Sequence, residues 1–137
     1  MNCVSSNYDI VIQEGGTYDK TFRWTNKDTG VPIPLFGCTG IMQGRKKYSD
    51  PLPLIDLPFV STPWVADVKS GIYILDDNVT PSLLGTFRMY ITNEDTKGKC
   101  DTFKDIIGVY NLFLYNSLGE AILNRHGVMT IEVSAAR

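Results

Sequence analysis

The sequence predicts an all-β fold, an antiparallel β-sandwich of about eight or nine short strands. Apolar and polar residues alternate along much of the chain, as they do in strands with one buried face. Turn-forming residues recur at intervals of about eight to twelve residues, and no segment has the apolar spacing of an amphipathic helix longer than one turn. Two sheets of such strands can share one apolar layer, as in immunoglobulin-like and jelly-roll sandwiches.

Length and composition predict a single domain over residues 1–137. A chain of 137 residues supports one core, because it buries about two-thirds of the surface that its unfolded form exposes. The hydrophobic fraction of 43% and the charged fraction of 20% are ordinary for a globular protein. Thirteen Lys and Arg residues oppose fifteen Asp and Glu residues in a mixed pattern, so we expect no nucleic-acid partner.

The first two predicted strands flank a pair of glycines. Residues 8–13 alternate between apolar and polar side chains, and in residues 17–25 aromatic side chains alternate with polar ones. Both segments are therefore expected to be half-buried strands. Gly15–Gly16 between them can adopt the positive φ angles that a tight reversal requires.

Turn residues and prolines then separate the second strand from the third. The Asn, Asp and Gly residues within 26–30 predict a hairpin tip, and Pro32 and Pro34 predict an edge segment because they lack backbone donors. Residues 38–47 alternate again and are expected to form the third strand.

A proline-rich segment over residues 48–64 interrupts the pattern. It excludes helix and leaves room for a short strand over residues 54–57 between irregular loops. Its prolines are Pro51, Pro53, Pro58 and Pro63.

The middle of the chain predicts two further strands. Residues 71–76 are apolar on both faces and are expected to form a central strand. Thr80 and Pro81 predict one capped helical turn, residues 86–92 alternate as a strand, and residues 93–101 are expected to form a polar loop.

The last third predicts a meander of three antiparallel strands. The three strands are residues 106–115, residues 121–125 and a final strand from residue 128. A turn over 116–120 connects the first two, and a reversal at His126–Gly127 connects the last two.

Residues that usually carry catalysis or bind metals are sparse. Cys3, Cys38 and Cys100 leave at least one thiol unpaired, which suits a reducing compartment, and they form no C-x-x-C pair. His126 is the only histidine, and its expected place in a turn accounts for it without catalysis. We therefore predict no enzyme activity, no cofactor, no metal and no small-molecule substrate.

Three charged segments have a structural interpretation as well as a functional one. Asp76–Asp77 and Glu94–Asp95 could supply calcium ligands, but neither has the alternate-residue spacing of a calcium loop, so solvated turns are favoured. Residues 44–47, Gly-Arg-Lys-Lys, could contact phosphates or anionic glycans; a solvated strand end is the commoner case.

The order of the turn glycines and aromatic strands resembles a family of small virion proteins of tailed bacteriophages. The segments that carry the resemblance are EGGTYDKTFRW, GVPIPLFGCTGIMQGR and GVYNLFLYNSLGEAILNRHGVMTIEV, at both ends of the chain. The layout is also similar to the N-terminal attachment domain of phage upper baseplate proteins. Matching residues are Gly16, Thr17, Trp24, Gly30, Pro32, Leu35, Gly37, Thr39, Gly108, Tyr110, Gly119, Gly127 and Val133.

The resemblance implies a structural role in a virion. We expect an adaptor or accessory subunit of the tail, baseplate or neck that binds other virion proteins and copies of itself. The N-terminus lacks a basic stretch followed by an apolar one, and no run is long enough to span a membrane, so we expect synthesis in the host cytoplasm and no membrane partner. We expect no receptor-binding domain after Arg137 and therefore no role of this chain in host recognition.

The proline-rich segment supplies the candidate contact residues. Trp64 and Phe59, with the neighbouring Tyr48 and Arg45, are predicted to contact a partner protein, because an apolar loop that cannot pair in a sheet must cover something. The alternative is packing against the protein's own sheet.

Other functions stay open from the sequence. A capsid decoration protein would use the same sandwich. A carbohydrate-binding module would place Trp24, Trp64 or several tyrosines in an exposed row. An enzyme would have to use His126 and the cysteines.

Overall fold

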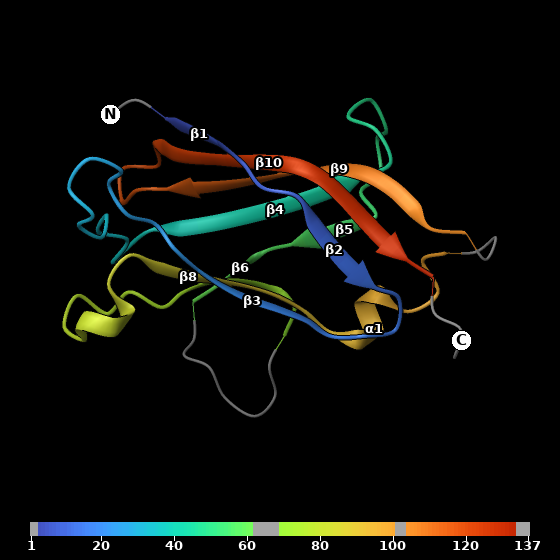
Figure 1. The fold of residues 1–137 in the computed structure, drawn as a ribbon, viewed down its shortest axis with the longest axis horizontal. Helices are drawn as coiled ribbons and strands as arrows, with labels where there is room; N and C mark the ends of the chain where they lie inside the picture. Colours follow the sequence, from blue (N-terminus) through green and yellow to red (C-terminus); the bar gives the residue numbers. More distant parts are fainter. Residues whose placement is uncertain (1–2, 62–68, 101–103, 134–137) are drawn as a thin grey trace.

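The computed structural model describes residues 3–61, 69–100 and 104–133, which form two packed β-sheets (Figure 1). The described part contains ten strands, one 3-10 helix and one short α-helix, so the predicted β-sandwich is confirmed. The larger sheet comprises β1 (Val4–Asn7), β2 (Ile10–Gln13), β4 (Thr39–Arg45), β5 (Ile55–Leu57), β9 (Ile106–Tyr115) and β10 (Ala121–Glu132). The smaller sheet comprises β3 (Tyr18–Arg23), β6 (Phe59–Val60), β7 (Gly71–Ile74) and β8 (Thr86–Ile91).

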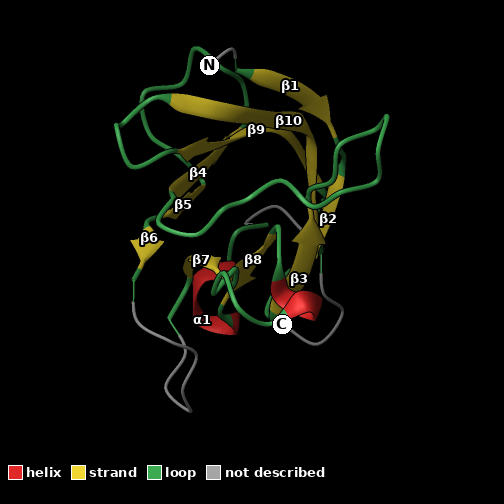
Figure 2. Ribbon diagram, turned by 90° about the vertical axis from the view of Figure 1, so that its left-hand side faces the viewer, coloured by secondary structure: helices red, strands yellow, loops and turns green. Residues whose placement is uncertain are grey.

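The two sheets are mixed and not purely antiparallel. The larger sheet has the order β1-β10-β9-β4-β5, with β2 also paired to β10, and the smaller has the order β3-β8-β7-β6. Figure 2 shows the two layers one above the other. The parallel pairs are β1 with β10, β2 with β10, and β6 with β7. The N-terminal segment thus follows one edge of β10 almost from end to end (Figure 1).

The predicted reversal at His126–Gly127 is wrong, because β10 is continuous through both residues. The amide of Tyr8 donates to the carbonyl of His126 at 2.9 Å, where the chain passes from β1 to β2. A Cβ atom on Gly127 would lie 2.5 Å from the carbonyl oxygen of Tyr8. The glycine therefore permits a close approach of two backbones, and no turn is needed to explain it.

Two predicted turns are present. Gly15 has a φ of 78°, but the chain crosses there from the larger sheet to the smaller one, so β2 and β3 do not form a hairpin. The predicted hairpin tip is confirmed, since the amide of Asn26 donates to the carbonyl of Val31 at 2.8 Å and Gly30 has a φ of 71°.

The middle of the chain follows the prediction with two additions. The short strand expected in the proline-rich segment is β5, and β6 follows it. β7 is a central strand, as predicted, and η1 (Pro81–Leu83) is the expected single helical turn. The loop expected after β8 begins with α1 (Asn93–Thr96), for which the side chain of Thr92 accepts a hydrogen bond from the amide of Asp95.

The core lies between the sheets and is apolar. β4 contributes its alternate residue Met42, β9 contributes Leu112, and β8 contributes Phe87 and Met89, all with 0% exposure. The rings of Phe22 and Phe87 stack at a centroid distance of 5.2 Å. The guanidinium of Arg125, which lines the cleft described below, lies over both rings.

Candidate functional site

The structure separates the contact residues predicted from the sequence. Arg45 ends β4 and Tyr48 follows it, whereas β5 runs back along β4, with Met42 opposite Leu57. Phe59 therefore lies near the beginning of β4, at the opposite end from Arg45. Trp64 lies outside the described residues. The described members do not form one patch.

Each described member has a different environment. The guanidinium of Arg45 donates to the carbonyl of Asp50 at 2.9 Å and to Oε1 of Gln43 at 3.0 Å, which holds the loop after β4. Tyr48 is 59% exposed. Phe59 is half-buried beside a shallow hollow of about 260 Å³ at the beginning of β4. A role of these residues in an interface stays a prediction.

A cleft that the sequence did not indicate opens at one side of the sandwich. It has a volume of about 620 Å³ and lies between β1 of the larger sheet and the segment that follows β3. We call it the edge cleft. It is lined by Val4, Ser5, Ser6, Asn7, Arg23, Trp24, Thr25, Asn26, Lys27, Ile33 and Arg125.

Arg125 is the unusual residue of the edge cleft, because it projects from the inner face of β10. It belongs to the same alternate series as the buried Leu123 and Met129. Its guanidinium carbon lies 5.0 Å from the ring centroid of Phe22, 5.6 Å from that of Tyr8 and 5.7 Å from that of Phe87. Cation–π attraction at these distances partly replaces the lost hydration.

The charge of Arg125 is not matched by a carboxylate among the described residues. Its Nε atom is buried and has no hydrogen-bond partner there. Burial lowers the pKa of Arg125, while the nearby Tyr110 and Tyr8 act in the opposite direction. A guanidinium nevertheless stays protonated in proteins, so the cleft contains a fixed, partly desolvated cation.

The rest of the lining adds positive charge and polar groups. Arg23 and Lys27 are the other charged lining residues, and none of the described lining residues is acidic. Arg23 donates to two neutral acceptors, the carbonyls of Leu84 at 3.1 Å and Pro81 at 2.6 Å. The edge cleft is therefore suited to an anionic group.

The outer face of the larger sheet exposes apolar side chains. Val11 and Ile107 lie on either side of Thr130, Val128 lies opposite Val109, and Ile41 lies opposite Phe113. Phe113 and Tyr115 stack at a centroid distance of 6.1 Å. The outer face is defined here by Val11, Ile41, Ile107, Val109, Phe113, Tyr115 and Val128. Ile107 is the most exposed member, at 71%.

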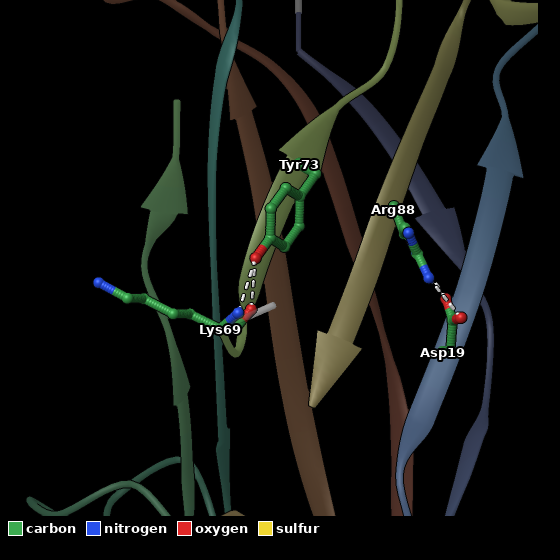
Figure 3. A network of polar contacts seen from close by, with 4 residues as sticks. All are labelled: Asp19, Lys69, Tyr73 and Arg88. Carbon is green, nitrogen blue, oxygen red and sulfur yellow. Dashed lines mark hydrogen bonds and ion pairs between the residues drawn. The ribbon is translucent and has the colours of Figure 1, made fainter. Parts of the chain in front are cut away.

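The outer side of the smaller sheet differs, because several of its side chains are engaged within the chain (Figure 3). Arg88 of β8 and Asp19 of β3 form a two-pronged ion pair, with distances of 2.6 and 2.5 Å. The hydroxyl of Tyr73 donates to the carbonyl of Lys69 and accepts from its amide. Tyr73 is only 4% exposed.

The predicted solvation of Asp76 is wrong, because its side chain is only 4% exposed. Its Oδ2 accepts from the amides of Leu35 at 2.8 Å and Gly85 at 2.9 Å, and its Oδ1 accepts from Asn78 at 2.9 Å. Asp77 caps the turn that leads to Thr80, as a turn residue does. Asp76 thus has a structural role, because its carboxylate connects three backbone positions. The sequence pattern did not distinguish it from Asp77.

None of the sequence candidates for chemistry is among the residues that line the edge cleft. Cys38 and Cys100 are buried, Cys3 is exposed, and none of the three forms a disulfide bond. Burial raises the pKa of Cys38, and the charge of Asp76 adds to this effect. His126 projects on the same side of β10 as Val128. Within the described residues no cluster of His, Cys, Asp and Glu has the arrangement of a metal site.

Comparisons with known proteins give no family assignment: no family model matches the sequence, and no curated protein is significantly similar to it. No helix in the described part of the chain has the length and apolar character that crossing a membrane requires.

Proposed function

We propose that this protein is a structural subunit of a tailed-phage particle, located in the tail, baseplate or neck, which acts by binding other virion proteins and copies of itself. The observation that carries the proposal is the exposed apolar outer face of the larger sheet. The function requires contact area and slow dissociation, and no catalysed reaction.

The outer face has the composition of an interface core. Its aliphatic residues and two aromatic residues form groups that a polar row separates. In this row His126 lies opposite Asn111 in the sheet register, and Asn111 lies opposite Gln43. Specific protein interfaces combine apolar anchors with polar groups in this way. Scattered single apolar residues are normal on a surface, but a group across β2, β10, β9 and β4 indicates a binding surface.

The smaller sheet also supports binding through the outer face of the larger sheet. Asp19, Tyr73 and Arg88 have partners within their own chain. The outer side of the smaller sheet therefore has fewer polar groups available for contacts with another protein. A carbohydrate-binding module is less well supported, because Trp24 is half-buried and packs against the core instead of standing in an exposed row.

Mass spectrometry of separated heads and tails tests the proposal on particles produced from the genome that encodes this chain. We expect the chain in the tail fraction. Its presence in heads alone would favour a capsid decoration protein, and its absence from both fractions would reject a virion role.

A matched pair of variants tests the role of the outer face in binding. Ile107→Asp places a charge in the outer face, whereas Leu118→Asp places one in the turn after β9, where Leu118 is 82% exposed. Both should keep a β-rich circular-dichroism spectrum. We expect Ile107→Asp to be lost from particles and Leu118→Asp to be incorporated; equal incorporation would contradict a role of the outer face.

A further inference from the structure

We propose that the edge cleft binds an acidic side chain of an extended segment from a partner protein, and that Arg125 is its anchor. The inference rests on the proposed function in one respect, namely that the protein acts by binding other proteins. It concerns a different surface from the outer face, and it can fail independently.

The environment of the Arg125 guanidinium favours a carboxylate as the ligand. Its guanidinium is surrounded by the rings of Tyr8, Phe22 and Phe87, and its Nε has no partner among the described residues. Such packing restricts the side chain before a ligand arrives, so little conformational freedom is lost on binding. A planar guanidinium matches a carboxylate with two parallel hydrogen bonds, and desolvation strengthens that pair.

The outer edge of β1 favours an extended protein segment as the carrier of that carboxylate. Among the described strands β1 pairs only with β10, so its other edge presents unpaired backbone donors and acceptors. Ser6 of β1 lies opposite Arg125 in the sheet register. A segment that adds to β1 as a further strand can direct alternate side chains toward the cleft, where one of them reaches Arg125.

The lining favours an acidic residue in that segment over a basic or neutral one. Arg23 and Lys27 give the opening the same sign of charge as Arg125, and no described lining residue is acidic. A lysine would meet repulsion from three cations. A neutral residue would leave the guanidinium desolvated and without a carboxylate.

A library of immobilised pentapeptides, with β-forming residues and a randomised central position, tests the inference on the purified full chain. We expect central Asp and Glu to be enriched, and replacing a bound peptide's Glu by Gln to weaken binding by about tenfold or more. The shift of the Trp24 indole N–H in nuclear magnetic resonance spectra reports occupation of the cleft.

Arg125→Met is the decisive variant. It removes the charge but keeps an apolar side chain, and such replacements of buried charges often leave stability unchanged or higher. Urea unfolding checks this. We expect the acidic enrichment to disappear with Arg125→Met and to persist with Arg88→Met, which removes an arginine of the smaller sheet outside the cleft. No enrichment with the native chain, or enrichment that survives Arg125→Met, would overturn the inference.

Two further probes distinguish other sources of an anion. Glucuronic acid and inorganic phosphate are titrated separately against the native chain. Binding of either one with the affinity of the acidic peptides, abolished by Arg125→Met, would reassign the cleft to a small anion and reject the peptide. Incorporation into particles is measured independently, so a chain that binds acidic peptides but is absent from virions would refute the proposed function alone.

Discussion

At the scale of single residues, the clearest structural group is the carboxylate of Asp76. It receives amide hydrogen bonds from three separate positions, Leu35, Asn78 and Gly85. Burial by itself would raise the pKa of Asp76, but these three amides outweigh that effect and hold the pKa below its ordinary value of 3.8. The charged form is therefore part of the folded structure.

Removing the carboxylate should destabilise the protein. Asp76→Ala leaves three amides without their acceptor. We expect the free energy of unfolding to fall by about 2–4 kcal/mol, because hydrogen bonds to charged groups are the stronger ones. Urea denaturation measures the difference. Asp77→Ala is the matched control and should have a smaller effect, since its side chain is exposed; equal losses would contradict the assignment.

The same group should give the stability a defined pH dependence. Because folding lowers the pKa of Asp76, its contribution is complete above the ordinary pKa of 3.8 and is lost as the pH falls through the folded value. The difference in unfolding free energy between the native chain and Asp76→Asn should thus be constant from pH 7 to about pH 5 and shrink below about pH 4. A difference that does not shrink in acid would show that the carboxylate's charge is not involved.

At the scale of elements, β10 organises the larger sheet. It pairs with β9 along one edge and with β1 and then β2 along the other. The segment between β1 and β2 is held at Gly127: the hydroxyl of Tyr110 donates to the carbonyl of Tyr8, and Asp9 accepts from the amide of Val128 at 3.0 Å. The absence of a side chain at Gly127 is what permits this contact.

A side chain at that position should loosen both N-terminal strands. Gly127→Ala places a methyl group where the carbonyl of Tyr8 now lies, so the backbone must shift. We expect a loss of about 2 kcal/mol or more and faster amide hydrogen exchange in β1 and β2 than in β7. Val128→Ala is the control on the same strand. Unchanged exchange in β1 would show that the close approach is not required.

Most strands of the sandwich could be predicted from the sequence, although β1 and β6 were not. Of the strand pairings, the predicted meander contained only the antiparallel pair of β9 and β10. Alternation identifies β3, β4 and β8 because it is a local property. The partner of a strand is not local, and nothing in residues 4–13 indicates a parallel register with β10. The turn expected at His126–Gly127 illustrates the same limit, because glycine serves both for reversals and for close backbone contact.

The edge cleft was hidden from the sequence for a related reason. The predicted strand ended at Arg125, next to the reversal expected at His126–Gly127. Once β10 is continuous, the alternation of Leu123, Arg125 and Met129 directs the arginine inward. That series was the available signal. The rings of Phe22 and Phe87 belong to distant segments, so their position around the guanidinium could not be predicted locally.

At the scale of the whole molecule, the two sides of the sandwich differ in their apolar exposure. The outer face of the larger sheet presents Ile107 and Val128 to solvent, whereas Arg88 and Tyr73 of the smaller sheet are held by contacts within the chain. An asymmetric sandwich of this kind suits a subunit that docks with one side toward its neighbours. The edge cleft adds a second surface, at the side of the sandwich where β1 lies.

Hydroxyl-radical footprinting of the free chain and of the chain in purified particles tests whether the outer face forms the interface. We expect Ile107 and Val128 to become protected in particles, while Val79 and Leu118, which are 79% and 82% exposed in the free chain, stay reactive. Equal modification of Ile107 and Val128 in both states would show that the larger sheet does not form the interface.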